Sequence, residues 1–219
     1  MGQEVDLMRH YPKQSNRMDQ RQVVTKEQRR ISRMFSFDYF DGDRIYGYGG
    51  HTYHPRFWSE TVQLFSDYYS LTAASSILDV GCAKGFMLKD FVELTPGMGV
   101  TGIDISGYAI DHADPTVRAN VVVGNATDLP YPDGEFDLVV SINTIHNLPH
   151  VSVLKALREI ERVGNGNSFV MVDGWRNEQE KVDLESWVLT AQTMLHVDDW
   201  CMLFDEAGYT GDYSFWSPR

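Results

Sequence analysis

The sequence predicts a doubly wound α/β domain with a mostly parallel sheet of six or seven strands. Short apolar runs rich in valine and isoleucine recur between residues 76 and 172, and segments with helical spacing separate them. Strands that alternate with helices form parallel sheets covered on both faces, with right-handed crossovers. The length of 219 residues suits one such domain with an appendage.

Each element of this domain is predicted from its own pattern. The expected buried strands are residues 76–80, 99–103, 120–123, 136–142 and 168–172, and residues 212–216 remain for a last strand. Helices are expected over residues 55–71, 85–93, 107–113, 151–163 and 197–207. The clearest is 151–163, because Val153, Leu157 and Ile160 share one face while Arg158 and Glu161 share the other.

The N-terminal part of the chain differs from the rest in charge. Residues 1–35 carry eight basic and four acidic side chains, a net charge of +4, whereas the whole chain has −12 and the remainder therefore −16. We divide the chain into an arm and lid segment, 1–45, and a main domain, 46–219. The arm, partly helical near residues 26–34, either docks on its own acidic domain or closes over the active site, where it could recruit an anionic acceptor.

Composition excludes several classes of protein. The net charge of −12 disfavours nucleic acid as the main partner. No apolar run reaches the roughly 18 to 20 residues of a membrane span, and the charged N-terminus is unlike a secretory signal. Two cysteines, Cys82 and Cys201, do not form a disulfide framework, so a cytoplasmic location is expected. No metal-ligand spacing occurs, which favours metal-free chemistry.

A small-residue turn follows the first predicted strand and opens a helix. Small residues at Gly81, Ala83 and Gly85 let backbone N–H groups approach a ligand. Asp104 ends the next strand, 23 residues after Gly81, where an acid can accept hydrogen bonds from ribose hydroxyls. Phe86 occupies the position where a dinucleotide fingerprint needs its last glycine. The pattern therefore indicates a nucleoside site other than that of NAD or FAD.

Four ordered motifs resemble those of class I S-adenosylmethionine-dependent methyltransferases, which have a Rossmann-like fold. Residues 77–85 resemble the first motif, an acidic residue followed by G-x-G-x-G with Ala83 in place of the central glycine. Residues 102–106, 124–130 and 136–148 resemble the ribose, adenine and fourth-strand motifs. The likeness covers about residues 55–210, and an aromatic–glycine loop at 46–50 is similar to that of a small-molecule subgroup.

The resemblance implies the cofactor S-adenosylmethionine and a set of residues that contact it. Asp79 would hold the turn or the methionine amino group, Asp104 the ribose, and Asn125 and Ala126 the adenine. The remaining expected contacts are Gly81, Cys82, Gly85, Ile105 and Ser141. The sheet of this family has seven strands with the last antiparallel. Too few residues follow 212–216 for that strand, so either the sheet has six strands or residues 174–195 supply an unexpected element.

The acceptor side is predicted from polar residues near the expected cofactor. His146 follows the fourth strand and could act as a base, because histidine titrates near neutral pH, and Tyr48 on the aromatic–glycine loop could assist. Residues that leave the carboxyl ends of strands, or lie on that loop, could bind the acceptor. These are Tyr46, His51, Arg56, Trp175, Arg176 and His196, of which the arginines would suit a carboxylate or phosphate.

Together these patterns predict an enzyme that transfers a methyl group to an oxygen or nitrogen of a small polar acceptor by direct displacement. A homodimer is left open. Two alternatives are an RNA or protein methyltransferase guided by the basic arm and a module that binds S-adenosylmethionine without catalysis. A dehydrogenase is the remote fourth interpretation.

Overall fold

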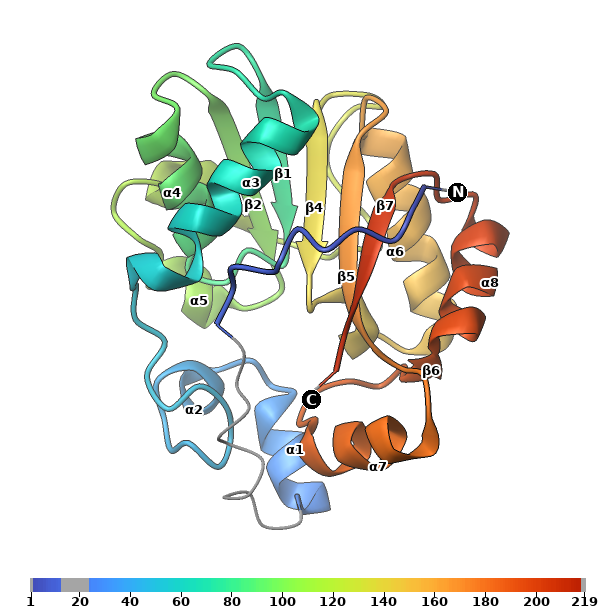
Figure 1. Cartoon of the computed structure of the whole chain (residues 1–219). Helices are drawn as coiled ribbons and strands as arrows, with labels where there is room; N and C mark the ends of the chain where they lie inside the picture. Colours follow the sequence, from blue (N-terminus) through green and yellow to red (C-terminus); the bar gives the residue numbers. More distant parts are fainter. Residues whose placement is uncertain (1, 13–23, 218–219) are drawn as a thin grey trace.

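The computed structural model describes residues 2–12 and 24–217, which form a doubly wound α/β domain (Figure 1). Its described strands make one seven-stranded sheet in the order β3-β2-β1-β4-β5, with β6 and β7 both paired to β5. Their bounds are β1 (Ser76–Val80), β2 (Gly99–Asp104), β3 (Val121–Val123), β4 (Leu138–Ile142), β5 (Ser168–Trp175), β6 (Leu195–His196) and β7 (Asp212–Trp216). The predicted fold class is confirmed.

Helices cover both faces of the sheet because each strand alternates its side chains between two apolar layers. On one face, Ile77 and Leu138 pack against α3 and α4, and on the other, Leu78 and Val139 pack against α6 and α8. The α-helices are α1 (Lys26–Ser32), α2 (Phe37–Phe40), α3 (Ser59–Tyr69), α4 (Phe86–Leu94), α5 (Gly107–Asp111), α6 (His150–Val163), α7 (Glu178–Trp187) and α8 (Val197–Ala207). Short 3-10 turns lie at η2 (Pro55–Phe57), η3 (Arg118–Asn120) and η4 (Ile145–Asn147).

The far edge of the sheet differs from the antiparallel ending that the resemblance implies. All described strand pairs are parallel, including β7 with β5 over the register Phe169↔Asp212 to Asp173↔Trp216. Helix α8 returns the chain across the sheet before β7 begins, so β7 runs in the same direction as β5. Residues 174–195 supply the unexpected element, which is α7 followed by the two-residue strand β6.

The first residues of the chain belong to the packed body. The Val5 N–H donates to the Tyr213 carbonyl at 2.9 Å, and Glu4 forms a parallel bridge with Tyr213. The chain then crosses in front of β7, β5 and β4 (Figure 1), and the buried side chains of Leu7 and Met8 join the core layer that contains α3. Residues 2–12 therefore pack against the main domain, while Lys13, Arg17 and Arg21 lie outside the described residues.

Two arginines of the arm, Arg29 and Arg33, bind backbone carbonyls of a distant segment. On α1, Arg29 donates to the carbonyls of Glu185 and Val188, and Arg33 to those of Thr190 and Ala191. These arginines fasten α1 to the segment that follows α7, so α1, α2 and α7 gather at the carboxyl ends of the strands (Figure 1). No helix within residues 2–12 and 24–217 is both long and apolar enough to cross a membrane.

Candidate active site

The turn after β1 has the backbone shape that its sequence requires. Gly81, Ala83 and Gly85 all have positive φ angles, +93°, +49° and +74°. A Cβ atom at position 81 would lie 2.0 Å from the Thr144 hydroxyl, so only glycine fits there. Ala83 adopts the same left-handed region despite its methyl group, at a cost in free energy.

Replacing Ala83 by glycine should therefore stabilise the protein. Glycine adopts the left-handed region without strain, which stabilises the folded state, but it also raises the chain entropy of the unfolded state. The difference predicts a gain of about 0.5–1 kcal/mol in the free energy of unfolding. Urea denaturation measures it. Ala74→Gly is the matched control, because Ala74 is exposed and its φ is negative, and it should lower the stability. A loss of stability in Ala83→Gly would show that the methyl group packs favourably.

Asp104 ties this turn to the end of β2. Its carboxylate accepts the N–H groups of Ala83 and Ser106, each at 2.8 Å. Burial raises the pKa of Asp104, against the opposing effect of those two N–H donors. The Gly124 N–H donates to the Asp104 carbonyl at 2.9 Å, which places the following Asn125 beside the same site. A carboxylate held this way at a strand end has the placement that ribose hydroxyls need.

Asp79 is a buried carboxylate with no cationic partner among the described residues. It is 6% exposed, and none of those residues donates a hydrogen bond to its side chain. Burial, with repulsion from Asp104, raises the pKa of Asp79 to about 7. An ion left unpaired in the interior is costly unless a ligand completes it. The methionine amino group of S-adenosylmethionine, which is a cation, fits this position.

The other expected cofactor contacts lie on the same edge of the sheet but differ in exposure. Cys82 is buried, and its burial raises the thiol pKa. The Ser141 hydroxyl is fully buried and donates to the Val80 carbonyl at 3.1 Å. Ile105 is more than half exposed, and Ala126 is partly buried. The Asn125 side-chain oxygen accepts from the N–H and hydroxyl of Thr127, so its amide nitrogen is the group left for a ligand.

Residues 35–54, which include the end of the predicted arm and lid segment and are called the lid segment below, are fastened to the turn by Lys84. The Lys84 ammonium lies 2.6 Å from an Asp41 carboxylate oxygen and donates to the His51 carbonyl at 2.9 Å. Tyr108 donates to the same Asp41 oxygen at 2.7 Å. Lys84 is only 7% exposed, so the ion pair is largely shielded from solvent. The sequence analysis missed this link, because Lys84 and Asp41 are 43 residues apart.

Lys84→Met should loosen the lid. Although burial raises the Asp41 pKa, hydrogen bonds from Lys84 and Tyr108 outweigh it and lower the pKa to about 2. The pair therefore stabilises the fold above about pH 4 and loses that effect as the pH falls from 4 to 2. We expect a loss of about 2–3 kcal/mol at neutral pH and faster hydrogen exchange in residues 41–51. Arg30→Met is the control: its pair with Glu27 is exposed to solvent, so its loss should change the stability little.

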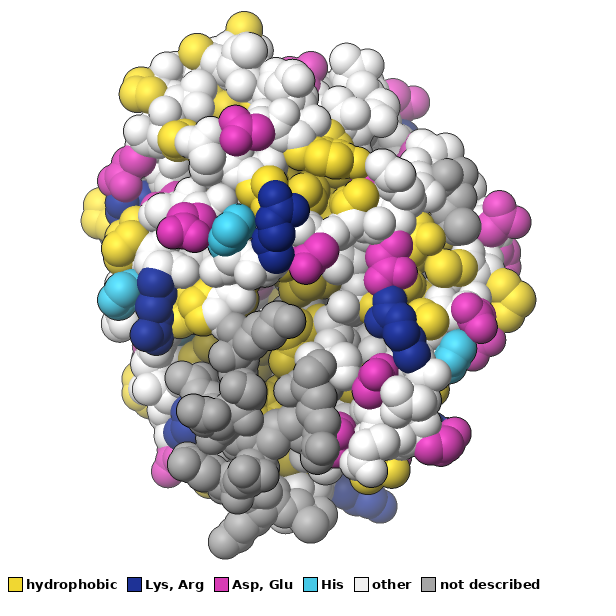
Figure 2. Space-filling model, in the orientation of Figure 1, with side chains coloured by type: hydrophobic (Ala, Val, Ile, Leu, Met, Phe, Trp, Pro, Cys, Tyr) yellow, Lys and Arg dark blue, Asp and Glu magenta, His cyan; other side chains and the backbone are white. Residues whose placement is uncertain are grey.

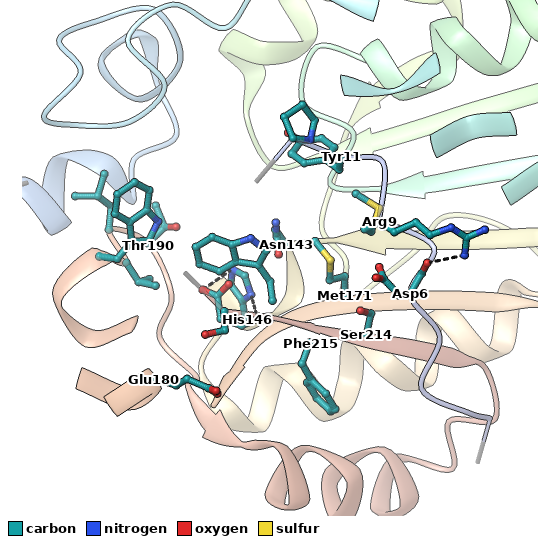
Figure 3. A pocket seen from close by; sticks show the side chains of 18 of the residues that line it. Asp6, Arg9, Tyr11, Asn143, His146, Met171, Glu180, Thr190, Ser214 and Phe215 are labelled. Atoms are coloured by element: carbon teal, nitrogen blue, oxygen red, sulfur yellow. Dashed lines mark hydrogen bonds and ion pairs between the residues drawn. The ribbon is translucent and has the colours of Figure 1, made fainter. Parts of the chain in front are cut away.

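A cavity of about 470 Å³ lies at the carboxyl ends of β4, β5 and β7. Figure 3 shows His146 and Asn143 at its centre, with Thr190 on one side and Tyr11 and Arg9 on the other. In Figure 2, hydrophobic side chains are visible in a hollow at the middle of this face, with acidic and basic groups around it. The cavity adjoins the turn after β1, because Asn143 lines it and the next residue, Thr144, packs on Gly81.

His146 and Asp173 form a buried pair on the wall of this cavity. The His146 Nδ1 accepts the backbone N–H of Asp173 at 3.0 Å, so a neutral imidazole carries its proton on Nε2. That Nε2 lies 3.7 Å from an Asp173 carboxylate oxygen. Burial lowers the pKa of His146, against the attraction of Asp173, and burial also raises the pKa of Asp173. Burial therefore disfavours an isolated charge on either group, so a charge on one of them needs an opposite charge close by.

Of the other residues predicted for catalysis and acceptor binding, some line the cavity and some lie outside it. Tyr48 and Arg176 line the cavity, and the Tyr48 side chain is partly exposed there. His51 packs on the Phe86 ring, and its burial lowers its pKa to about 4. His51 and four further positions are outside the cavity lining: Tyr46; Arg56, which lies over the Phe57 ring; Trp175, which packs against Leu184; and His196, which caps α8.

Several lining residues were missed by the sequence analysis. Asp173 lies in the last part of β5, and its position at the carboxyl end of a buried strand was the available signal. Asn143 has a positive φ of 53° just after β4, a conformation that asparagine tolerates. Tyr39 and the segment Trp187–Leu189 reach the cavity only through the packing of α1, α2 and α7.

Comparison with known proteins decides the family. Residues 78–172, from β1 to β5, match the family described as "Methyltransferase domain". The chain contains a class I S-adenosylmethionine-dependent methyltransferase domain. The match includes Asp79, Gly81 and Asp104, and S-adenosylmethionine is accordingly the cofactor of this domain.

Individual relatives of the methyltransferase domain act on different molecules. The chain is 29% identical to 2-methyl-6-phytyl-1,4-hydroquinone methyltransferase of Synechocystis, over 74% of this chain and 54% of that one. It is 32% identical to tRNA (carboxymethyluridine(34)-5-O)-methyltransferase of Arabidopsis thaliana, over 60% and 31%. The YcgJ protein of Bacillus subtilis shares the fold, with a TM-score of 0.55, 19% identity and coverage of 67% and 66%. The chain spans about a third to a half of the length of these curated relatives.

Proposed function

We propose that this protein transfers the methyl group of S-adenosylmethionine to an oxygen or nitrogen of a small acceptor held in the 470 Å³ cavity. The observation that carries the proposal is the position of that cavity. It adjoins the turn after β1, since Asn143 lines it and the neighbouring Thr144 lies against Gly81, and its volume is in the range of small-molecule sites. The acceptor would thus lie next to the methyl donor, as a direct displacement requires.

Some residues of the site would bind the cofactor, and others would accept a proton from the acceptor. Asp104 would hold the ribose and Asp79 the amino group, while Gly81, Ala83 and Gly85 leave room for the cofactor chain. S-adenosylmethionine, when bound, supplies a methyl group activated by a sulfonium. The lid segment, held by Lys84, would keep water out of the site. His146 and Asp173, which both line the cavity, would take up the proton that leaves the acceptor.

A macromolecular acceptor has less support. Arg29 and Arg33, the described arm residues best placed to guide RNA, already bind backbone carbonyls. The net charge of −12 opposes phosphate binding. Salt-dependent binding of RNA by the full chain would support the RNA interpretation, and its absence would exclude it.

The direct experiment uses S-adenosylmethionine labelled in its methyl group. The protein is incubated with a fractionated extract of small metabolites, and labelled products are identified by mass spectrometry. The proposal expects at least one labelled small molecule, which disappears when Asp104→Ala replaces the parent protein. Cofactor binding without any labelled product would favour the non-catalytic binding module.

A further inference from the structure

Asp173 is the most unusual charged group in the acceptor cavity. Its side chain is 7% exposed and lines the cavity, and none of the described residues donates a hydrogen bond to its carboxylate. Its own backbone is fully used, since its N–H donates to His146 and its carbonyl accepts from the Trp200 indole at 2.9 Å. A buried carboxylate that faces a cavity and accepts no hydrogen bond from the described residues indicates that a ligand supplies the donor.

His146 does not neutralise this carboxylate. Its Nδ1 is occupied by the Asp173 N–H, and its Nε2 is 3.7 Å from the carboxylate oxygen, beyond hydrogen-bond distance. A second proton would make the imidazole a cation, but burial opposes that state, since it lowers the pKa of His146. The neutral imidazole therefore leaves the Asp173 charge available to a bound molecule.

The arginines of the cavity are already engaged, which weakens the case for an anionic acceptor. Arg176 forms an ion pair with Glu4 across the cavity edge. Arg44 donates to the carbonyls of Gly47 and Tyr48, and Arg9 to that of Asp6. Carboxylates outnumber arginines among the lining residues, which include Glu4, Asp6, Asp173 and Glu180 against Arg9, Arg44 and Arg176.

The rest of the lining is aromatic and apolar. Aromatic residues supply much of the lining, and rings attract cations through their negative faces. They are Tyr11, Tyr39, Tyr48, Trp187, Phe215 and Trp216, of which Phe215 points its ring away from the cavity and stacks on Phe204 (Figure 3). Such walls bind an apolar or ring-containing body, while one buried carboxylate at the end of β5 binds a single polar group.

We infer that the acceptor is an amine, protonated in solution, on an apolar or aromatic body, and that Asp173 binds its nitrogen. This inference rests on the proposed function and narrows its substrate class. The ammonium gives one proton to the Asp173 carboxylate, which frees the nitrogen lone pair. That pair forms the bond to the methyl carbon as the carbon–sulfur bond breaks, and the bonding electrons stay on sulfur. The product is a methylated ammonium ion, and Asp173 returns its proton to solvent.

Three probes with the same body test this inference by binding alone. They are 4-phenylbutylamine, 4-phenylbutan-1-ol and 4-phenylbutyrate, titrated calorimetrically at neutral pH into the full chain saturated with S-adenosylhomocysteine. We expect the amine to bind at least about tenfold more tightly than the alcohol or the acid, since a buried charge pair contributes more than a neutral hydrogen bond. Equal or tighter binding of the alcohol or acid would overturn the inference, as would the failure of all three to bind.

Asp173→Asn keeps the shape of the side chain and removes its charge. It should lower the amine affinity about tenfold and leave the alcohol affinity within about twofold. Asp198→Asn is the matched control, because Asp198 is exposed and lies outside the cavity. Unchanged S-adenosylhomocysteine binding shows that the variant is folded. An amine preference that survives in Asp173→Asn contradicts the inference.

Failure of the proposed function gives a different result. If the amine binds in an Asp173-dependent way but no amine receives labelled methyl, the catalytic proposal fails and the ligand class stands. If labelled methyl reaches only hydroxyl acceptors, with the same rate in Asp173→Asn, the ligand class fails and the catalytic proposal stands.

Discussion

Asp79→Asn is expected to stabilise the ligand-free protein and to weaken its binding of S-adenosylmethionine. The pKa of Asp79 is raised to about 7 by burial and by Asp104, above its ordinary value of 3.8. The folded state therefore binds a proton more tightly than the unfolded state, and stability falls as the pH rises from about 4 to above 7. Removing the carboxylate abolishes that loss, which amounts to at most about 4 kcal/mol.

The direction of the stability change and the pH range over which it occurs make this prediction specific. The gain in the free energy of unfolding should be largest above pH 7 and shrink as the pH falls towards 4, in urea denaturation at several pH values. Asp111→Asn, on the exposed face of α5, is the control and should change stability little. Isothermal titration should show weaker cofactor binding by Asp79→Asn. Equal or lower stability at pH 8 would mean that Asp79 has a partner cation in the free protein.

Asp104→Ala is expected to weaken S-adenosylmethionine binding about 100-fold or more. A hydrogen bond to a charged acceptor contributes about 1.5–3 kcal/mol, and a ribose offers two hydroxyl donors. The substitution also removes the acceptor for the N–H groups of Ala83 and Ser106, so the turn after β1 loses its tie to β2. Both effects reduce affinity, and calorimetry measures them together.

Two further variants separate these effects. Asp104→Asn keeps one carbonyl acceptor and should lie between Ala and the parent. Asp111→Ala, seven residues along on α5, is the matched control and should bind S-adenosylmethionine as the parent does. Parent-like affinity in Asp104→Ala would show that the ribose is held elsewhere.

The cofactor half of the site was predictable because it is local in sequence. The turn from Asp79 to Gly85 and the acid at Asp104 follow consecutive strands, and neighbouring parallel strands bring their carboxyl ends together. Phe86 argued against NAD and FAD, and this inference was also local in sequence, because Phe86 begins the helix that follows the turn. The free charge of Asp79 was not predictable, because it depends on what surrounds the carboxylate.

The acceptor half was only partly predictable because it is assembled from distant segments. His146 and Arg176 were singled out and line the cavity, whereas Asp173 and Tyr39 were not singled out. Arg176 was expected to bind an anion, yet Glu4 pairs with it from 172 residues away. No local pattern marks such a contact, since it requires the N-terminal segment to cross the sheet beside β7.

The sequence by itself determined the doubly wound fold and the cofactor, because apolar periodicity and turn chemistry act over a few residues. Only the tertiary structure decided the parallel ending of the sheet, the Lys84–Asp41 link and the burial of the Asp173 carboxylate beside His146. Those features depend on which distant groups are left without partners once the chain has packed, and burial then sets the energy of every charge that remains.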